Sequence, residues 1–303
     1  LALGGDSIVK GASGLAQKLG ASPFVAGLLL VAFGTSIPEL FVNARAYAVG
    51  AQDLALGNAV GSNIVNFGLT LGLAAIAAPL LVRMRLLSSL LVLLVVATLA
   101  LIVFGLDGVV SRVEGVVMLL AFVAMLAFVL ARGGRESIEV RDSIAAFATT
   151  RSALWMNLLR FAVASALLYF GAKLVVQSAP MIGASWGLSP LLVGLLPIAI
   201  GTALPEVAAA IAAARRGQGD MVVGHVIGSS LFNLLVVVGG MAALRPLPLP
   251  ASFVRLELPA AIAFALVLYP MLRGDLRISK GEGVILFVAF LGFVGLQLWL
   301  VAG

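Results

Sequence analysis

GTSIPEL at residues 34–40 recurs as GTALPEV at residues 201–207, which lies 167 residues later in a chain of 303 residues. The same offset aligns GNAVGSNIVN (57–66) with GHVIGSSLFN (224–233), and an offset of 168 aligns SRVEGVV (111–117) with SKGEGVI (279–285). Several motifs that match at nearly the same offset along the chain are not a chance similarity. The chain is therefore an internal duplication, and the repeat sets the architecture.

The composition around these motifs is that of a membrane protein. Hydrophobic residues make up 62% of the chain and charged residues 11%, whereas a soluble domain carries about 25% charged residues. A helix of about 20 apolar residues crosses a hydrocarbon core about 30 Å thick. The sequence predicts an all-α membrane protein with ten transmembrane helices, whose approximate limits are 1–19, 24–50, 54–80, 86–106, 113–131, 153–179, 188–214, 220–244, 254–272 and 281–302.

The longest polar stretch separates five predicted spans from the other five. It divides the chain into a first five-helix repeat (1–131), a linker (132–152) and a second five-helix repeat (153–303). Because five is an odd number, the second repeat is expected to enter the membrane from the opposite side, and inverted repeats are a recurring plan of secondary transporters.

Basic residues near the span ends predict the orientation, since the face with more Lys and Arg is cytoplasmic. Twelve fall on one face and four on the other. The linker is therefore expected in the cytoplasm, with both termini outside, in a multi-pass protein of the cell membrane. The richer face holds Lys18, Arg83, Arg85, Arg132, Arg135, Arg141, Arg151, Arg215, Arg216, Arg273, Arg277 and Lys280, and the poorer face holds Arg45, Arg112, Arg245 and Arg255.

Several functional classes are excluded by composition and motif. The net charge is +6, but the basic residues form no dense run, so nucleic acid is not an expected partner. The chain has no Cys and one His, which excludes thiolate and multi-His metal sites. Without a P-loop or Rossmann glycine loop, neither an enzyme nor an ATP-driven pump is expected. The expected partners are the lipid bilayer and inorganic cations, for a monomer that needs no cofactor. Because Leu1 already lies in an apolar run, we expect residues before it in the natural protein.

Two acidic residues stand out because they fall in the middle of predicted spans. Of the 13 acidic residues, we expect only Glu39 and Glu206 to lie deep in the membrane. A carboxylate at that depth costs at least about 2.5 kcal/mol unless it is paired or solvated. Each Glu follows a Pro, which lacks an N–H and so frees a helix carbonyl. With Thr35 and Thr202 nearby, this predicts an oxygen-rich pocket suited to Ca²⁺, which takes about six to eight oxygen ligands. The alternative is a pair of protonated, purely structural acids.

A second pair of polar clusters lies on the third and eighth spans. Asn58, Ser62 and Asn66 are spaced by four residues and share one helix face. Such side chains either face the pocket or hydrogen-bond neighbouring helices. His225 is either a structural replacement for Asn58 or a proton-sensitive group. Asp53 and Asp220 begin their spans and are interpreted as helix caps. The second repeat carries the same pattern in His225, Ser229 and Asn233.

Together these motifs resemble the two alpha-repeats of the sodium/calcium exchanger family, within the calcium/cation antiporter superfamily, over essentially the whole chain. The resemblance implies ten transmembrane helices and alternating access, in which the first and sixth helices slide past the helices that hold the site. It implies that Ca²⁺ is bound by Thr35, Glu39, Thr202 and Glu206. Sodium or accessory contacts are implied for Ala32, Ser36, Asn58, Ser62, Asn66, Ala199, His225, Ser229 and Asn233.

Three departures from the family pattern bear on the coupling ion. Ala203 stands where Ser is common, both central positions are Asn where one is often Asp, and His225 stands where Asn is usual. Two carboxylates neutralise one Ca²⁺, two Na⁺ or two H⁺, so exchange of two monovalent ions for one Ca²⁺ is electrically balanced. The expected function is a secondary antiporter that exports Ca²⁺ against Na⁺ entry. The alternatives are a proton-coupled antiporter of Ca²⁺ or another divalent cation, a cation channel and a nonconducting scaffold.

Overall fold

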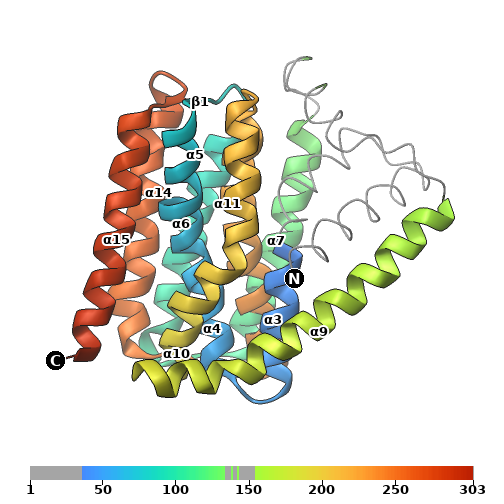
Figure 1. Ribbon diagram of the computed structural model, residues 1–303, viewed down its shortest axis with the longest axis vertical. Coiled ribbons are helices and arrows are strands. Elements are labelled where there is room, and N and C mark those ends of the chain that lie inside the picture. The colour runs from blue at the N-terminus through green and yellow to red at the C-terminus, as the bar shows by residue number, and fades with distance from the viewer. Residues whose placement is uncertain (1–35, 134–137, 139–141, 143–153, 303) are drawn as a thin grey trace.

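The computed structural model describes residues 36–133, 138, 142 and 154–302 (Figure 1). Predictions for residues 1–35, which include Ala32, Thr35 and the first predicted span, lie outside the described residues. The second predicted span, 24–50, is described only from residue 36 onwards, and the eight later spans can be compared with the helices.

The described chain consists of long helices, and several of them contain a π-helical turn. Residues 36–133 form α3 (Ile37–Ala48), α4 (Gln52–Val65), η2 (Asn66–Leu71), α5 (Gly72–Ala77), β1 (Leu80–Leu81), α6 (Leu86–Phe104), η3 (Gly105–Asp107), β2 (Val109–Val110) and α7 (Arg112–Gly133). Residues 154–302 form α9 (Leu154–Trp186), α10 (Pro190–Val193), η4 (Gly194–Ile198), α11 (Ala199–Arg215), α12 (Gly219–Phe232), η5 (Asn233–Val238), α13 (Gly239–Leu244), β3 (Leu247–Pro248), η6 (Phe253–Glu257), α14 (Leu258–Arg273), β4 (Arg277–Ile278) and α15 (Lys280–Ala302).

Within this part of the chain, seven helices are long and apolar enough to cross a membrane. An eighth span results if Pro190–Leu204 and Glu206–Arg215, which meet at a bend of 47°, are taken together. These eight coincide with the predicted spans that begin after residue 50, and the sixth extends further than expected, to Trp186. A multi-pass helical membrane protein is thus confirmed, while the count of ten stays a prediction.

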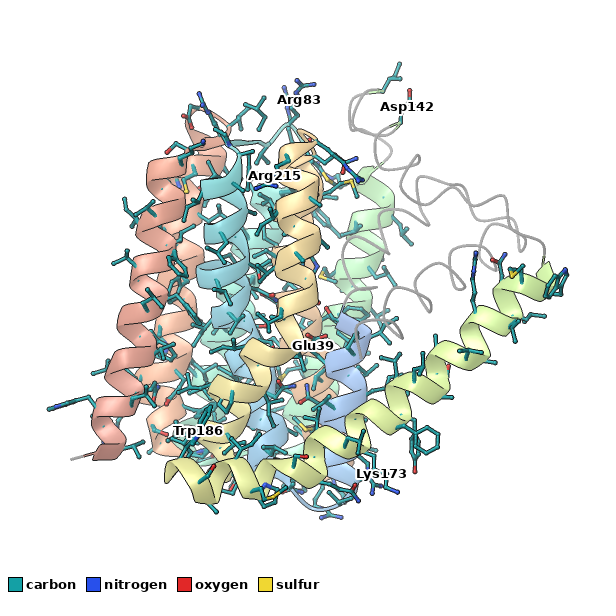
Figure 2. All side chains as sticks on the ribbon, in the orientation of Figure 1. Glu39, Arg83, Asp142, Lys173, Trp186 and Arg215 are labelled. Atoms are coloured by element: carbon teal, nitrogen blue, oxygen red, sulfur yellow. The ribbon has the colours of Figure 1, made fainter. Side chains whose placement is uncertain are left out.

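Two short antiparallel ribbons lie at opposite ends of the helix bundle. Leu80 pairs with Ile278 in one, and Val109 pairs with Pro248 in the other. The full length of α6 separates β1 from β2, and Figure 1 labels β1 at one end. The ribbons therefore place Arg83 near Arg277 and Arg112 near Arg245, as the distribution of basic residues predicted. Figure 2 accordingly shows Arg83 and Arg215 at one end and Lys173 and Trp186 at the other. Which end faces the cytoplasm stays a prediction.

The two central helical spans, 52–77 and 219–244, form the core of the bundle. In each, 89% of the most apolar window is buried, against 22% for α7 and for α15. The first span ends beside β1, whereas the second begins there, since Gly219 lies against the backbone of Leu81. Matching segments of the two repeats therefore run in opposite directions.

The two repeats interlock and do not pack as separate bundles. Helix α7 packs on α13, α15 packs on α5, and α6 packs on α14. Close approach is possible because glycines face each other: a Cβ on Gly283 would lie 2.8 Å from the carbonyl oxygen of Gly72, and a Cβ on Gly239 would lie 3.3 Å from that of Gly115. These two contacts occupy equivalent positions of the repeat. Each half therefore completes the packing of the other.

Helix α9 differs from the rest in length and in coverage. Its 33 residues span about 50 Å at 1.5 Å per residue, more than the hydrocarbon core of a bilayer. Figure 1 shows it crossing the bundle obliquely and leaving it at one end. Only 24% of its most apolar window is buried, and its main contact is with α3. A helix this long has to tilt to fit the membrane.

Candidate ion-binding site

Glu39 lies in the first turn of α3, next to Pro38, which was predicted to break the second span. Pro38 is at the second position of α3, where its missing N–H leaves no hydrogen bond unmade. The first turn of a helix has free N–H groups and a partial positive charge, which favour a carboxylate. Glu39 is only 1% exposed, and Figure 2 shows it about midway between the ends of the bundle.

Glu206 occupies the equivalent position after a sharp bend. The axis turns by 47° between Leu204 and Glu206, where the predicted helix break at Pro205 falls. Glu206 is 8% exposed, and its carboxylate interacts electrostatically with that of Glu39. The two acids that the sequence singled out therefore converge in the interior, although they are 167 residues apart.

Thr202 lies beside both acids. Its hydroxyl is 3.0 Å from the carbonyl of Ile198 and 3.2 Å from the carbonyl of Ala199, and it is within hydrogen-bond reach of Glu39. Because the proton of this hydroxyl can be donated within its own helix, its lone pairs can accept from or coordinate a ligand. The structure thus brings Thr202 and Ala199 to the predicted site.

Ser36, Ser229 and Asn66 form a hydrogen-bonded group that joins three helices. Ser36 Oγ donates to Ser229 Oγ over 2.6 Å, and Asn66 Nδ2 donates to the same oxygen over 3.1 Å. All three are buried, and all three were predicted as accessory residues. This group closes the space between the start of α3 and the two central helices.

Asn63 contacts its own counterpart in the second repeat. Its Nδ2 donates to the carbonyl of Ser230 over 3.2 Å, and Ser230 is its own counterpart 167 residues later. Asn233 Nδ2 donates to Asn63 Oδ1 over 3.3 Å. A residue can contact its own counterpart only near the two-fold axis that relates the repeats, so this axis passes through the site.

Each central helix changes from α- to π-helical geometry at a predicted site residue. The π-helical turn η2 begins at Asn66, and η5 begins at Asn233. Turns of this type are uncommon and are frequent at functional sites. Their equal position in both repeats was not visible from the sequence pattern.

Asn43 is a site residue that the sequence analysis missed. It is fully buried, and its Oδ1 accepts a hydrogen bond of 2.9 Å from Asn58 Nδ2. Its spacing of four residues from Glu39 places both side chains on one face of α3. That spacing could have identified Asn43, but its counterpart in the second repeat is Ala210, so comparison of the repeats did not select it.

His225 occupies the position equivalent to Asn58 and contacts an acid. Its Nε2 lies 3.6 Å from Glu206 Oε2, and the side chain is largely buried. The structure therefore places the one imidazole of the chain at the predicted site, next to one of its two carboxylates.

The strongest feature of the site is a set of buried oxygens that have no hydrogen-bond partner within the described residues. A buried polar atom without a partner is unfavourable, and a bound ion would satisfy such oxygens. Among the described residues, no group of three or more His, Cys, Asp or Glu could hold a metal, so a bound cation would draw mainly on neutral oxygens. The unpartnered atoms are Glu39 Oε2, Asn58 Oδ1, Ser62 Oγ, Asn66 Oδ1, Glu206 Oε1 and Asn233 Oδ1.

Asp53 and Asp220 lie in the first turns of α4 and α12, as predicted, where the helix dipole favours a carboxylate. Asp220 Oδ1 also accepts from the backbone N–H groups of Arg83 and Met84, both at 2.7 Å, and so fixes the turn after β1. A further acid, which the sequence analysis did not single out, is buried as well, since Glu257 is 2% exposed.

Comparison with known proteins agrees with this arrangement. The family described as "Sodium/calcium exchanger protein" matches residues 1–131 and 156–299. CaxA of Alkalimonas amylolytica is 35% identical over 293 residues, which cover 95% of this chain and 92% of CaxA. Sodium/calcium exchanger MaX1 of Methanosarcina acetivorans is 28% identical over 329 residues, which cover 97% of this chain and 94% of MaX1.

Solved structures give the same result. The sodium-calcium exchanger NCX_Mj, soaked with Na⁺ and Sr²⁺, superimposes with a TM-score of 0.69 at 28% identity, and the alignment covers 97% of this chain and 93% of NCX_Mj. The resemblance expected from the paired motifs is confirmed: this chain belongs to the sodium/calcium exchanger family.

Proposed function

We propose that this protein is a secondary antiporter that exports Ca²⁺ from the cytoplasm in exchange for Na⁺. The observation that carries the proposal is the group of buried oxygens, without a hydrogen-bond partner in the described part of the chain, around two converging carboxylates on the axis between the repeats. Family membership and the name of MaX1 as a sodium/calcium exchanger support it.

The proposed ligands divide by their chemistry. Glu39 and Glu206 supply two negative charges, which neutralise one Ca²⁺. Thr202 adds a hydroxyl oxygen, and Thr35 is its counterpart in the first repeat. Sodium would use the carbonyls of Ala32 and Ala199 together with hydroxyl and amide oxygens from Ser36, Asn58, Ser62, Asn66, Ser229 and Asn233.

Exchange follows if these ligands serve either one Ca²⁺ or the competing monovalent ions, but never both. Leaving both carboxylates unpaired in the membrane interior is unfavourable, so the empty carrier would cross between its two states rarely. This mutual exclusion couples the two fluxes, and the ion gradients set the direction.

Alternating access would use α9, the least covered of the helices near the site. It lies against α3, which carries Glu39, and its length allows it to shift along the bundle. A cavity of about 580 Å³ lies between α9 and the start of α4 and is lined by Pro180, Gly183 and Asp53 among others. This cavity gives α9 space to move against the start of α4.

Flux in liposomes tests the function. Purified protein in liposomes loaded with ⁴⁵Ca²⁺ should release it when Na⁺ is added outside, and should retain it in choline. Release that is independent of external Na⁺ over a wide range would overturn sodium coupling. Conductance without coupled exchange would identify a channel.

A proton-coupled antiporter is the second candidate, favoured by the contact of His225 with Glu206. It predicts Ca²⁺ release driven by a pH gradient in the absence of Na⁺. The variant His225→Asn restores the residue type of the first repeat and should flatten that pH dependence. An unchanged pH profile in this variant would exclude the imidazole from coupling.

The proposed orientation puts the end with Arg83 in the cytoplasm and both chain termini outside. Because the chain has no Cys, single cysteines can be introduced at Asp142 in the linker and at Asp107 near β2. In intact cells, a membrane-impermeant maleimide should label only Asp107→Cys. Labelling of Asp142→Cys alone would reverse the orientation.

A further inference from the structure

The second half of the ion-binding site carries an imidazole, whereas the first half has Asn58 at the equivalent position. His225 is largely buried, at 8% exposure, and its Nε2 lies 3.6 Å from Glu206 Oε2. The imidazole also interacts electrostatically with Glu39. The one imidazole of the chain is therefore close to both acids of the site.

The spacing of His225 and Glu206 suits two ligands of one metal ion. At 3.6 Å, Nε2 and Oε2 are further apart than the distance of about 2.7–3.2 Å that is typical of an N–H···O hydrogen bond. Zinc binds imidazole nitrogen and carboxylate oxygen at about 2.1 Å, so two such ligands at a tetrahedral angle are about 3.4 Å apart. An ion between the two side chains would therefore need only a small adjustment of either.

Oxygen atoms can supply the rest of the coordination shell. Glu206 Oε1 and Glu39 Oε2 are buried and have no hydrogen-bond partner in the described part of the chain, and Thr202 lies within hydrogen-bond reach of Glu39. In that part, no group of three or more His, Cys, Asp or Glu could hold a metal. Hydroxyl and amide oxygens would therefore complete the shell of an ion on this pair, and the two acids balance the charge of a dication.

The neighbour of the imidazole differs from the neighbour of Asn58. In the first half, Asn58 donates a hydrogen bond to Asn43 on α3. The position equivalent to Asn43 is Ala210, whose side chain has no acceptor atom, so the second half has no equivalent of this bond. The changes at both positions thus replace a contact between two amides by a contact between His225 and Glu206.

An imidazole favours a class of ion that differs from Ca²⁺ and Na⁺. Ca²⁺ takes oxygen ligands, whereas imidazole nitrogen suits Zn²⁺ and other transition-metal ions. We propose that His225 and Glu206 bind a divalent transition-metal ion, such as Zn²⁺ or Co²⁺, as a further substrate of the same site. The proposal rests on the proposed antiport, because such an ion competes with Ca²⁺ for Glu39 and Glu206.

X-ray absorption at the zinc edge tests the ligand directly. Protein prepared without a polyhistidine tag and loaded with substoichiometric Zn²⁺ should show scattering from an imidazole bound to the metal. Because the chain has one His and no Cys, this signal comes from His225, and His225→Asn should remove it. A shell of oxygen atoms alone in the wild type would overturn the proposal, and the proposed exchange of Ca²⁺ for Na⁺ would be unaffected by that result.

Competition binding measures the effect on selectivity. The affinity for Zn²⁺ relative to Ca²⁺ should fall by more than about tenfold in His225→Asn, because an amide oxygen replaces the nitrogen ligand. Asn43→Ala/Asn58→His copies the second half and should raise this ratio. Glu282→Gln is the control, since Glu282 bonds to Ser279 at the start of α15, and it should keep the wild-type ratio. An equal loss of affinity for both ions in His225→Asn would show a structural role and overturn the proposal.

Flux in liposomes separates this proposal from the proposed function. Liposomes loaded with ⁴⁵Ca²⁺ should release it when either Na⁺ or Zn²⁺ is added outside, and the release driven by Zn²⁺ should be the more impaired in His225→Asn. Release with Na⁺ but not with Zn²⁺ would keep the proposed function and overturn Zn²⁺ as a substrate. Release with Zn²⁺ but not with Na⁺ would support the transition-metal substrate and overturn sodium coupling.

Discussion

The two halves of the ion-binding site keep the same acids but surround them differently. In the first half, Asn58 donates to Asn43, and both are neutral. In the second half, the same positions hold His225 and Ala210, and the imidazole lies 3.6 Å from Glu206. Compared with the two Asn residues of the first half, the second half thus combines a larger residue, His225, with a smaller one, Ala210. Both halves retain the acid, whereas the neighbouring residues have diverged in pairs, and the imidazole of the second half lies in contact with Glu206.

The largest effect is expected where the halves agree, at the two acids. Glu39→Gln and Glu206→Gln should each weaken Ca²⁺ binding about a thousandfold, since the attraction between unit charges 4 Å apart is about 4 kcal/mol at an effective dielectric constant of 20. Isothermal titration calorimetry with Ca²⁺ measures the loss.

Glu282→Gln is the matched control for this pair, because Glu282 bonds to Ser279 at the start of α15, away from the ion-binding site. Its affinity for Ca²⁺ should equal that of the wild type. A much larger loss in one site variant than in the other would show that the two acids are not equivalent ligands.

The next effect concerns the glycines through which the halves interlock. A Cβ at Gly115 would overlap the backbone of Ala243, so Gly115→Ala should lower the free energy of unfolding by about 3 kcal/mol, the upper part of the range for overpacking. At Gly72 the nearest atoms would be 3.1 Å away, and Gly72→Ala should be milder. Thermal unfolding in detergent compares the two.

Gly292→Ala serves as the control, because a Cβ there meets no atom within 4 Å. This variant should unfold at or above the wild-type temperature, since Ala is the better helix former. If Gly72→Ala proved the more damaging substitution, the two interlocking contacts would not be packed as described.

An exchange of neighbours between the halves tests their paired divergence. Asn58→His alone leaves the Asn43 side chain without its partner and should cost about 2 kcal/mol of stability. Asn43→Ala/Asn58→His copies the second half and should recover part of this loss. The double-mutant cycle should show a coupling free energy above about 0.5 kcal/mol. Strict additivity of the two changes would argue against a paired replacement.

The smallest effect is expected at the hydrogen bonds between helices. Ser229→Ala removes the acceptor of both Ser36 and Asn66 and should lower stability by about 1 kcal/mol. Because Ser229 is also a proposed sodium ligand, its loss should raise the Na⁺ concentration needed for half-maximal Ca²⁺ release more than it alters Ca²⁺ affinity. Ser88→Ala, on an exposed hydrogen bond at the start of α6, should change neither quantity.

Sequence alone predicted the long helices and the two acids for a simple reason. Charges are scarce in this chain, so Lys and Arg mark the span ends, and Glu39 and Glu206 stand out within apolar runs. Because the sequence is an internal duplication, each of these motifs occurs twice. Features that depend on contacts between distant segments were not predictable in this way.

Glu257 illustrates the limit. It lies close to the start of its span and two residues from Arg255, where charges are ordinary, and only Gln297, 40 residues away, reveals its burial. Asp220 similarly acquires its role from a turn more than 130 residues earlier. Asn43 escaped because its counterpart is Ala210. For Glu257 and Asp220 the decisive contact is made with a distant segment, which the local sequence pattern does not show.

The reciprocal packing of α7 on α13 and of α15 on α5 has a consequence for each half of the chain taken by itself. Without the second half, the glycine faces of α5 and α7 would lie uncovered. A second copy of the first half, related by the two-fold axis that passes beside Asn63 and Ser230, would cover them with equivalent contacts. The contacts inside the present protein are thus those that an exchanged homodimer of half-length chains would make.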